Sequence, residues 1–101
     1  MMQNPVFTME HIVAKVKPLA DKYHVKEIYL FGSYARGEAD ENSDLDFLVY
    51  GGEKFKRTMI FALAEDLRET LEKKVDVFEI GEVNPDSNFY KTIMKEKVLV
   101  A

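Results

Sequence analysis

Two aspartates, Asp44 and Asp46, stand one residue apart where an acidic loop runs into an apolar segment. On a β-strand, residues i and i+2 point to the same face and lie roughly 6–7 Å apart, so both carboxylates would share one face. Neighbouring carboxylates repel each other unless a cation lies between them. Mg²⁺ favours oxygen ligands and is commonly held by one or two carboxylates together with phosphate oxygens. The spacing therefore indicates a Mg²⁺ site.

A plainer interpretation treats Asp44 as a turn residue and Asp46 as a solvated carboxylate. The apolar run that begins at Leu45 weakens this alternative for Asp46, because a charge at the root of a buried strand needs a compensating partner. A third carboxylate, Asp76, interrupts another apolar segment, where a polar residue on a half-exposed strand is the rival explanation. Three inward acids on neighbouring strands favour two-metal phosphoryl or nucleotidyl chemistry, with the ions organising a triphosphate and activating the acceptor oxygen.

A Gly-Ser pair, Gly32 and Ser33, follows a short apolar segment upstream of the aspartates. Glycine permits close backbone approach and unusual dihedral angles. We expect Ser33 to cap a short helix over residues 33–37, whose free N–H groups would form a phosphate site. Taken alone, an ordinary capped turn explains the pair equally well, so the phosphate interpretation depends on the nearby carboxylates.

The elements that must position these residues follow from hydrophobic periodicity. The pattern predicts an α/β domain, with helices packed on a sheet, in the order helix, strand, short helix, strand, helix, strand, helix, strand. Thr8 is the expected N-cap of the first helix, and Pro18 is expected to kink or split it. The other helices are predicted over 33–37, 55–73 and 88–96, and the strands over 26–33, 45–52, 73–81 and the last five residues.

Composition narrows the class of protein. The chain has 101 residues, which fits one domain spanning 1–101, and its net charge of −4 with acids crowded between residues 38 and 46 argues against direct nucleic-acid binding. It has no cysteine, no apolar run of the ~20 residues that a membrane span needs, and no evident secretory signal. A cytoplasmic protein without membrane contact is expected.

The combined motif resembles the nucleotidyltransferase superfamily of the DNA polymerase β type. It consists of Gly32-Ser33, ten intervening residues, Asp44-x-Asp46, and Asp76 in a later strand. The string GSYARGEADENSDLDFLV is similar to that of the minimal nucleotidyltransferases, the small partners of HEPN-domain proteins. The resemblance covers roughly residues 8–100 and implies the nucleotidyltransferase fold, with a mixed sheet of about four strands.

The resemblance also implies roles for individual residues. Gly32 and Ser33 would hold the β- and γ-phosphates of the nucleotide, and Asp44 and Asp46 would bind two Mg²⁺ ions. Asp76 would bind the catalytic ion and help to deprotonate or orient the acceptor hydroxyl. Arg36 would neutralise phosphate charge, although a solvated surface arginine is nearly as good an explanation.

The implied activity is that of an antitoxin, which transfers AMP from ATP to a tyrosine hydroxyl of a HEPN-domain toxin. The short chain leaves little room for an acceptor-binding domain, so we expect a protein substrate or a second subunit, such as a homo-oligomer, to complete the site. Two alternatives stay open: a binding module that neutralises a toxin by occlusion alone, and a small-molecule nucleotidyltransferase of the aminoglycoside-modifying kind.

Three aromatic residues near the ends of predicted elements bear on partner binding. Phe55, Phe89 and Tyr90 would either close the core or form a partner-facing patch. Because aromatic side chains are mostly buried, closure of the core is the favoured interpretation.

Overall fold

A computed structural model describes residues 6–101 and contains four strands, three α-helices and one 3₁₀ turn. Within these residues no helix is both long and apolar enough to cross a membrane. The elements, in chain order, are α1 (Met9–Lys22), β1 (Glu27–Phe31), β2 (Leu45–Tyr50), α2 (Met59–Leu71), β3 (Val75–Glu79), η1 (Ile80–Glu82), α3 (Asn88–Glu96) and β4 (Val98–Leu99).

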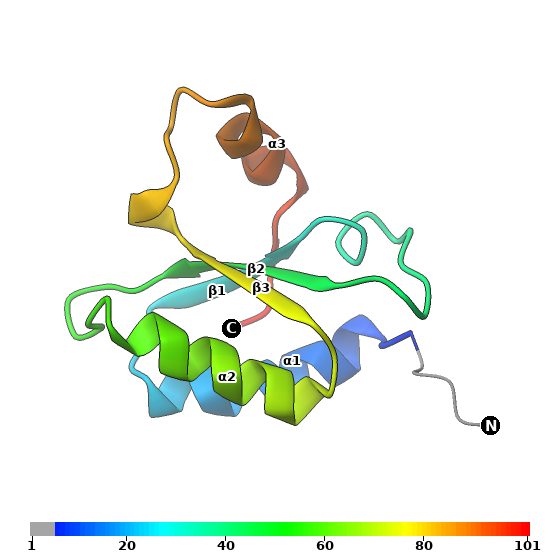
Figure 1. Cartoon of the computed structure of the whole chain (residues 1–101), viewed down its shortest axis with the longest axis horizontal. Coiled ribbons are helices and arrows are strands. Elements are labelled where there is room, and N and C mark those ends of the chain that lie inside the picture. The colour runs from blue at the N-terminus through cyan, green and yellow to red at the C-terminus, as the bar shows by residue number, and fades with distance from the viewer. Residues whose placement is uncertain (1–5) are drawn as a thin grey trace.

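The four strands form one mixed sheet in the order β3-β2-β1-β4. β1 pairs antiparallel with β2 and with β4, whereas β2 and β3 run parallel. Helices α1 and α2 lie side by side against one face of the sheet, and α3 lies over the other face (Figure 1). The predicted α/β class with a mixed four-stranded sheet is confirmed.

The main core lies between the sheet and the pair α1 and α2. Along α1, Ile12, Val16 and Ala20 recur every four residues and are all buried, because this spacing keeps them on one face of the helix. They meet the alternate residues of the strands that point the same way, such as Phe47 of β2, which is fully buried. A second cluster on the opposite face joins Phe31, Leu48 and Ile93 of α3.

The start of α1 is as predicted, and the helix continues past its proline. The Thr8 hydroxyl accepts a hydrogen bond from the His11 N–H at 3.1 Å, which caps the helix. Pro18 lies inside a helix that continues to Lys22, so it does not split the element. Where α1 meets α2, Asp66 accepts hydrogen bonds from Lys22 at 2.7 Å and from the Tyr23 hydroxyl at 2.5 Å.

The predicted short helix over residues 33–37 is wrong. The segment is a run of turns, in which the Arg36 N–H donates to the Gly32 carbonyl at 3.0 Å and the Glu38 N–H to the Ser33 carbonyl at 2.9 Å. Gly37 adopts a left-handed φ of 73°, which ends any helical continuation after a single turn. The strand before it stops at Phe31 because Gly32 also leaves the extended region, with φ at 78°.

The end of α2 offers a test of backbone strain. Glu72 caps the helix in the left-handed conformation, with φ at 54°. Any residue other than glycine adopts this backbone conformation at a cost of about 1 kcal/mol or more. We expect Glu72→Gly to raise the free energy of unfolding by about 1 kcal/mol and the Tm by about 4–8 °C. Thermal denaturation followed by circular dichroism measures the change. The matched control is Glu69→Gly inside α2, which should lower stability by about 1 kcal/mol, and equal effects at both positions would contradict the argument.

Candidate active site

The strand register brings two of the predicted carboxylates side by side. Asp46 pairs across the sheet with Phe31 of β1 on one side and with Asp76 of β3 on the other. Leu48, two residues after Asp46, belongs to the cluster beneath α3, so the Asp46 side chain is on that same face by strand alternation. Asp46 and Asp76 therefore lie opposite each other on neighbouring strands, with their side chains on the same face of the sheet. These two residues are called the aspartate row below.

Electrostatics confirm that these carboxylates influence one another. Burial is the largest of the causes that together raise the pKa of Asp46 from 3.8 to about 6, and the nearby charges of Asp76 and Asp44 act in the same direction. Arg36 opposes this shift, whereas Glu96 adds to it. Crowded carboxylates of this kind are stabilised by a cation, so the donor chemistry fits a divalent, oxygen-binding ion.

Asp44 directly precedes β2 and lies two residues before Asp46 in the chain. Its side chain is 40% exposed, and the Lys74 ammonium lies 3.9 Å from one carboxylate oxygen. Across residues 6–101 no three histidine or acidic side chains lie close enough to enclose an ion unaided. Mg²⁺ usually retains water and takes phosphate oxygens as ligands, so a complete cage of protein ligands is not required for its binding.

The Gly-Ser turn lies directly against Asp46. A Cβ added at Gly32 would collide with Oδ2 of Asp46, so only glycine lets the turn approach this closely. Ser33 follows, half-buried, and its carbonyl closes the turn with Glu38. The structure thus brings together Gly32, Asp46 and Asp76 at one end of the sheet.

The Arg36 side chain reaches the same end of the sheet as Gly32. Its guanidinium forms ion pairs with Glu38 at 2.8 Å and with Glu96 at 2.9 Å, and its side chain is 43% exposed. Glu96 also accepts a hydrogen bond from the Gly32 N–H at 3.2 Å. Arg36 is therefore neither a free surface residue nor, in this structure, available to an external anion without rearrangement.

Glu96 is the site residue that the sequence interpretation missed. It is the last residue of α3, where a negative charge is disfavoured by the partial negative charge of the helix C-terminus. An acidic residue at such a position indicates a stabilising partner elsewhere, and that signal was present in the sequence. Its partners, Gly32 and Arg36, lie 64 and 60 positions earlier in the chain.

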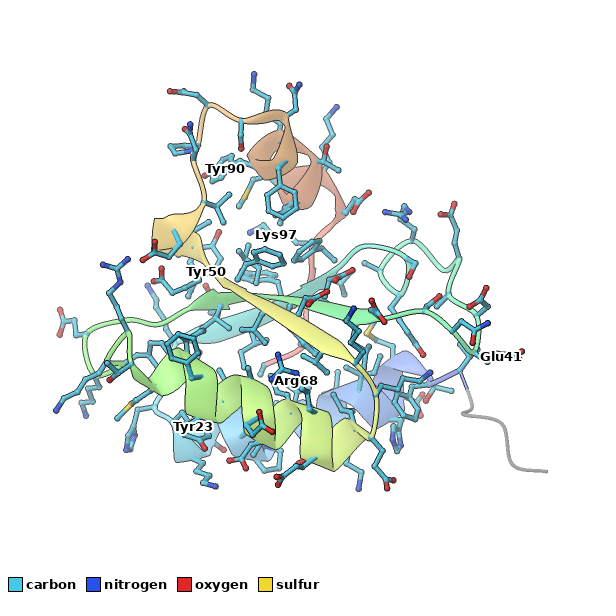
Figure 2. The ribbon with its side chains drawn as sticks, viewed as in Figure 1. Tyr23, Glu41, Tyr50, Arg68, Tyr90 and Lys97 are labelled. Atoms are coloured by element: carbon cyan, nitrogen blue, oxygen red, sulfur yellow. The ribbon has the colours of Figure 1, made fainter. Side chains whose placement is uncertain are left out.

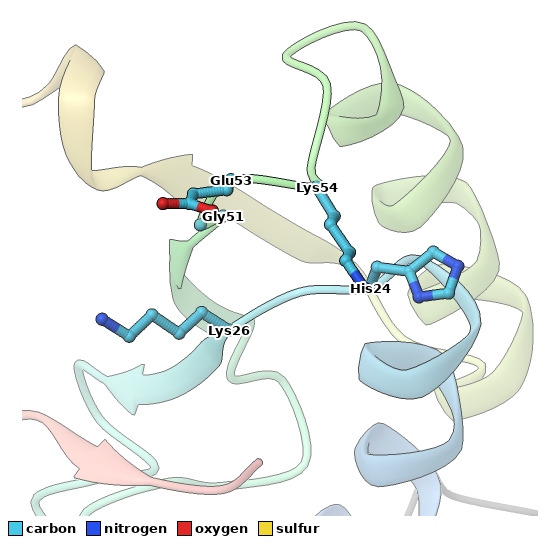
Figure 3. Close-up of a pocket in the computed structure, with 6 residues that line it drawn as sticks. His24, Lys26, Gly51, Glu53 and Lys54 are labelled. Carbon is cyan, nitrogen blue, oxygen red and sulfur yellow. The ribbon is translucent and has the colours of Figure 1, made fainter.

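A separate hollow of about 370 Å³ lies at the other end of β2. It is lined by His24, Lys26, Gly51, Gly52, Glu53 and Lys54 (Figure 3). Gly51 directly follows the last residue of β2, whereas Asp46 is near its beginning, so this hollow is apart from the carboxylates.

Comparison with known proteins decides the family. The family model described as "Polymerase beta, Nucleotidyltransferase" matches residues 14–101. The chain belongs to this family. It is also 36% identical over 99 residues to the protein adenylyltransferase MntA of Thermococcus cleftensis, an alignment that spans 94% of this chain and 98% of that protein. The predicted family and the assignment of the chain as a nucleotidyltransferase enzyme are confirmed.

Solved structures share the polymerase β-type fold. A chain in the crystal structure of a toxin–antitoxin with AMP-PNP matches with a TM-score of 0.74 at 23% identity, covering 88% of this chain and 72% of that one. A chain in the complex of tri-AMPylated Shewanella oneidensis HEPN toxin with MNT antitoxin matches with a TM-score of 0.70 at 19% identity, covering 93% and 72%. At these identities the likeness establishes the fold of this nucleotidyltransferase.

Proposed function

We propose that this nucleotidyltransferase is a Mg²⁺-dependent protein adenylyltransferase that moves AMP from ATP onto a tyrosine hydroxyl of a HEPN-domain toxin. The full-length similarity to a protein adenylyltransferase and the shared fold with toxin–antitoxin structures support the choice of substrate. The observation that carries the chemistry is the aspartate row of Asp46 and Asp76 with the Gly32 turn packed against it.

In the proposed reaction the acceptor oxygen attacks the α-phosphorus of ATP, the bond from that phosphorus to the bridging oxygen breaks, and pyrophosphate leaves. Bound Mg²⁺ would neutralise the triphosphate and lower the pKa of the acceptor hydroxyl. Asp44 and Asp46 would hold the ions, and Asp76 would hold an ion, orient the acceptor hydroxyl and accept its proton. This assignment agrees with the raised pKa of Asp46, whose charge an ion would stabilise.

The phosphate end of the site is assigned to the turn after β1. The Gly32 N–H and the Ser33 residue would bind the β- and γ-phosphates, and the Arg36 guanidinium would stabilise the charge that develops on the leaving pyrophosphate. Here the protein contributes positioning and charge stabilisation, because no side chain needs to form a covalent intermediate.

The decisive experiment searches the genes adjacent to that of this chain for a HEPN-domain protein and tests that protein as the acceptor. We expect the purified chain, given α-³²P-labelled ATP and Mg²⁺, to label that protein and to raise its mass by one or more AMP units. Removal of Mg²⁺ with EDTA should abolish labelling. Mapping by tandem mass spectrometry should place the modification on tyrosine, and a different acceptor residue would revise that part of the proposal.

The same assay separates the two alternatives. If the double variant Asp44→Asn with Asp46→Asn still neutralises the toxin without labelling it, occlusion is the mechanism and the adenylyltransferase proposal fails as an account of neutralisation. If AMP passes to an aminoglycoside and not to the HEPN protein, the chain is a small-molecule nucleotidyltransferase.

A further inference from the structure

Both oxygens of the Glu96 carboxylate accept hydrogen bonds from residues of the turn after β1. One of its oxygens, Oε2, accepts the Gly32 N–H at 3.2 Å, and the other, Oε1, accepts from Nη1 of Arg36 at 2.9 Å. The side chain is 17% exposed, much less than the 65% of Glu38, the other partner of Arg36. Glu96 is therefore enclosed at the turn, whereas Glu38 pairs with Arg36 from the solvent side.

The two donors that bind Glu96 are those assigned above to the nucleotide. A backbone N–H in a tight turn together with a guanidinium group is an arrangement that binds phosphate as readily as carboxylate. Both anions present two oxygens to the two donors, so they compete for one place. A phosphate cannot bond to the Gly32 N–H while Glu96 retains that hydrogen bond.

We propose that Glu96 is an internal occupant of the phosphate subsite, which the triphosphate must displace when it binds. This inference rests on the proposed nucleotide site and adds to it a built-in competitor at the end of α3. The carboxylate satisfies the turn N–H and Arg36 in the free protein, and it lowers the affinity of the free protein for the nucleotide.

The local charges make such a displacement feasible. Arg36 attracts Glu96, but Asp46 repels it, since the charge of Glu96 is one of the causes that raise the pKa of Asp46. Incoming Mg²⁺ and triphosphate would offer Arg36 a more highly charged partner. Because Glu96 is the last residue of α3, its side chain can leave without breaking the body of the helix, which is anchored by buried Ile93.

The test compares two variants that each remove one partner of Arg36. Glu96→Gln keeps the size of the side chain but removes its charge, and we expect it to bind Mg²⁺–AMP-PNP about three- to tenfold more tightly in isothermal titration calorimetry, since partly exposed charged pairs have effects of this order. Glu38→Gln removes a charge that contacts Arg36 but not Gly32, so its affinity should stay within about twofold of the native protein. Glu96→Ala serves as a second variant and should act in the same direction as Glu96→Gln.

A second measurement follows the contact itself. In the native protein, addition of Mg²⁺–AMP-PNP should shift the NMR resonance of the Gly32 amide, because its acceptor changes from carboxylate to phosphate. Unchanged or weaker binding in both Glu96 variants, with AMP-PNP still bound by the native protein, would overturn the displacement and leave the proposed function intact. Failure of every chain, including Glu96→Gln, to bind AMP-PNP would overturn both.

Discussion

Replacement of Asp46 by Asn is expected to abolish AMP transfer and at the same time to make the fold more stable. The loss should be at least a thousandfold, or about 4 kcal/mol of transition-state stabilisation, because the amide cannot hold a divalent ion in the aspartate row with Asp76. The radiolabel assay described above measures the loss. Retention of a tenth of the native rate would contradict the role assigned to Asp46.

The gain in stability follows from the sign of the pKa shift. Burial and the neighbouring carboxylates raise the pKa of Asp46 from 3.8 to about 6 in the folded chain, so the folded state binds its proton more strongly than the unfolded state does. The contribution of Asp46 to stability therefore falls as pH rises from about 4 to about 6, and its full penalty applies at neutral pH. Since the side chain is only partly buried, solvent screening limits the relief in Asp46→Asn to on the order of 1 kcal/mol.

Thermal denaturation in the presence of EDTA tests whether the ionised Asp46 side chain destabilises the folded chain. At pH 7.5, Asp46→Asn should melt about 4–8 °C above the native chain. Near pH 3.5 the difference should vanish, because the native carboxyl is then protonated in the folded state. Added Mg²⁺ should stabilise the native chain and leave the variant unchanged. A variant that melts below the native chain at pH 7.5 would show that Asp46 contributes to the fold rather than opposing it.

Replacement of Gly32 by Ala should damage both the fold and the site. The left-handed φ of 78° costs a residue with a Cβ about 1–2 kcal/mol, and the added methyl group would collide with Oδ2 of Asp46. Asp46 would have to rotate away from Asp76, so we expect AMP transfer to fall at least about a hundredfold, as for comparable displacements of reacting groups.

Gly37 provides the matched control, because it has almost the same φ, 73°, but no atom within 4 Å of an added Cβ. Gly37→Ala should lose about 1–2 kcal/mol of unfolding free energy, measured by urea denaturation, and keep native AMP transfer. Equal losses of activity in the two variants would mean that the backbone conformation of the turn matters and that the contact between Gly32 and Asp46 does not.

The sequence predicts the fold well because its strongest signals are local. The apolar pattern located α1, α2 and α3, and the strand predicted over residues 73–81 contains β3 with Asp76. The helix expected over 33–37 failed because a left-handed glycine follows too soon for a second turn to form. That outcome depends on the backbone angle of Gly37, which a periodicity argument does not consider.

Contacts between distant segments were beyond local reasoning. The contact of Glu96 with Gly32 and Arg36 joins residues about sixty positions apart, and it depends on how α3 is laid across the sheet. The aromatic residues gave a mixed result for the same reason. Phe55 packs against the main core, as favoured, whereas Phe89 stays 43% exposed beside Phe31 and Phe78.

The face beneath α3 is held together by aromatic and cationic groups as well as by aliphatic packing. The Lys97 ammonium lies 4.0 Å from the ring centre of Tyr29 and 5.3 Å from that of Tyr50, and Figure 2 shows Lys97 above Tyr50. The Tyr50 hydroxyl contacts the sulfur of Met94 at 3.8 Å. Because Lys97 directly follows Glu96, these contacts fix the point from which the Glu96 side chain reaches the turn.

Among the strands that the structure describes, β3 forms one of the two edges of the sheet, and it carries Asp76. A large, folded substrate can therefore reach this carboxylate from beyond the rim, and no strand has to separate to admit it. For the proposed protein acceptor, a convex loop or helix end that projects one side chain across this edge would be sufficient. In the proposed reaction, such geometry would select the acceptor by the shape of another protein's surface around the modified side chain.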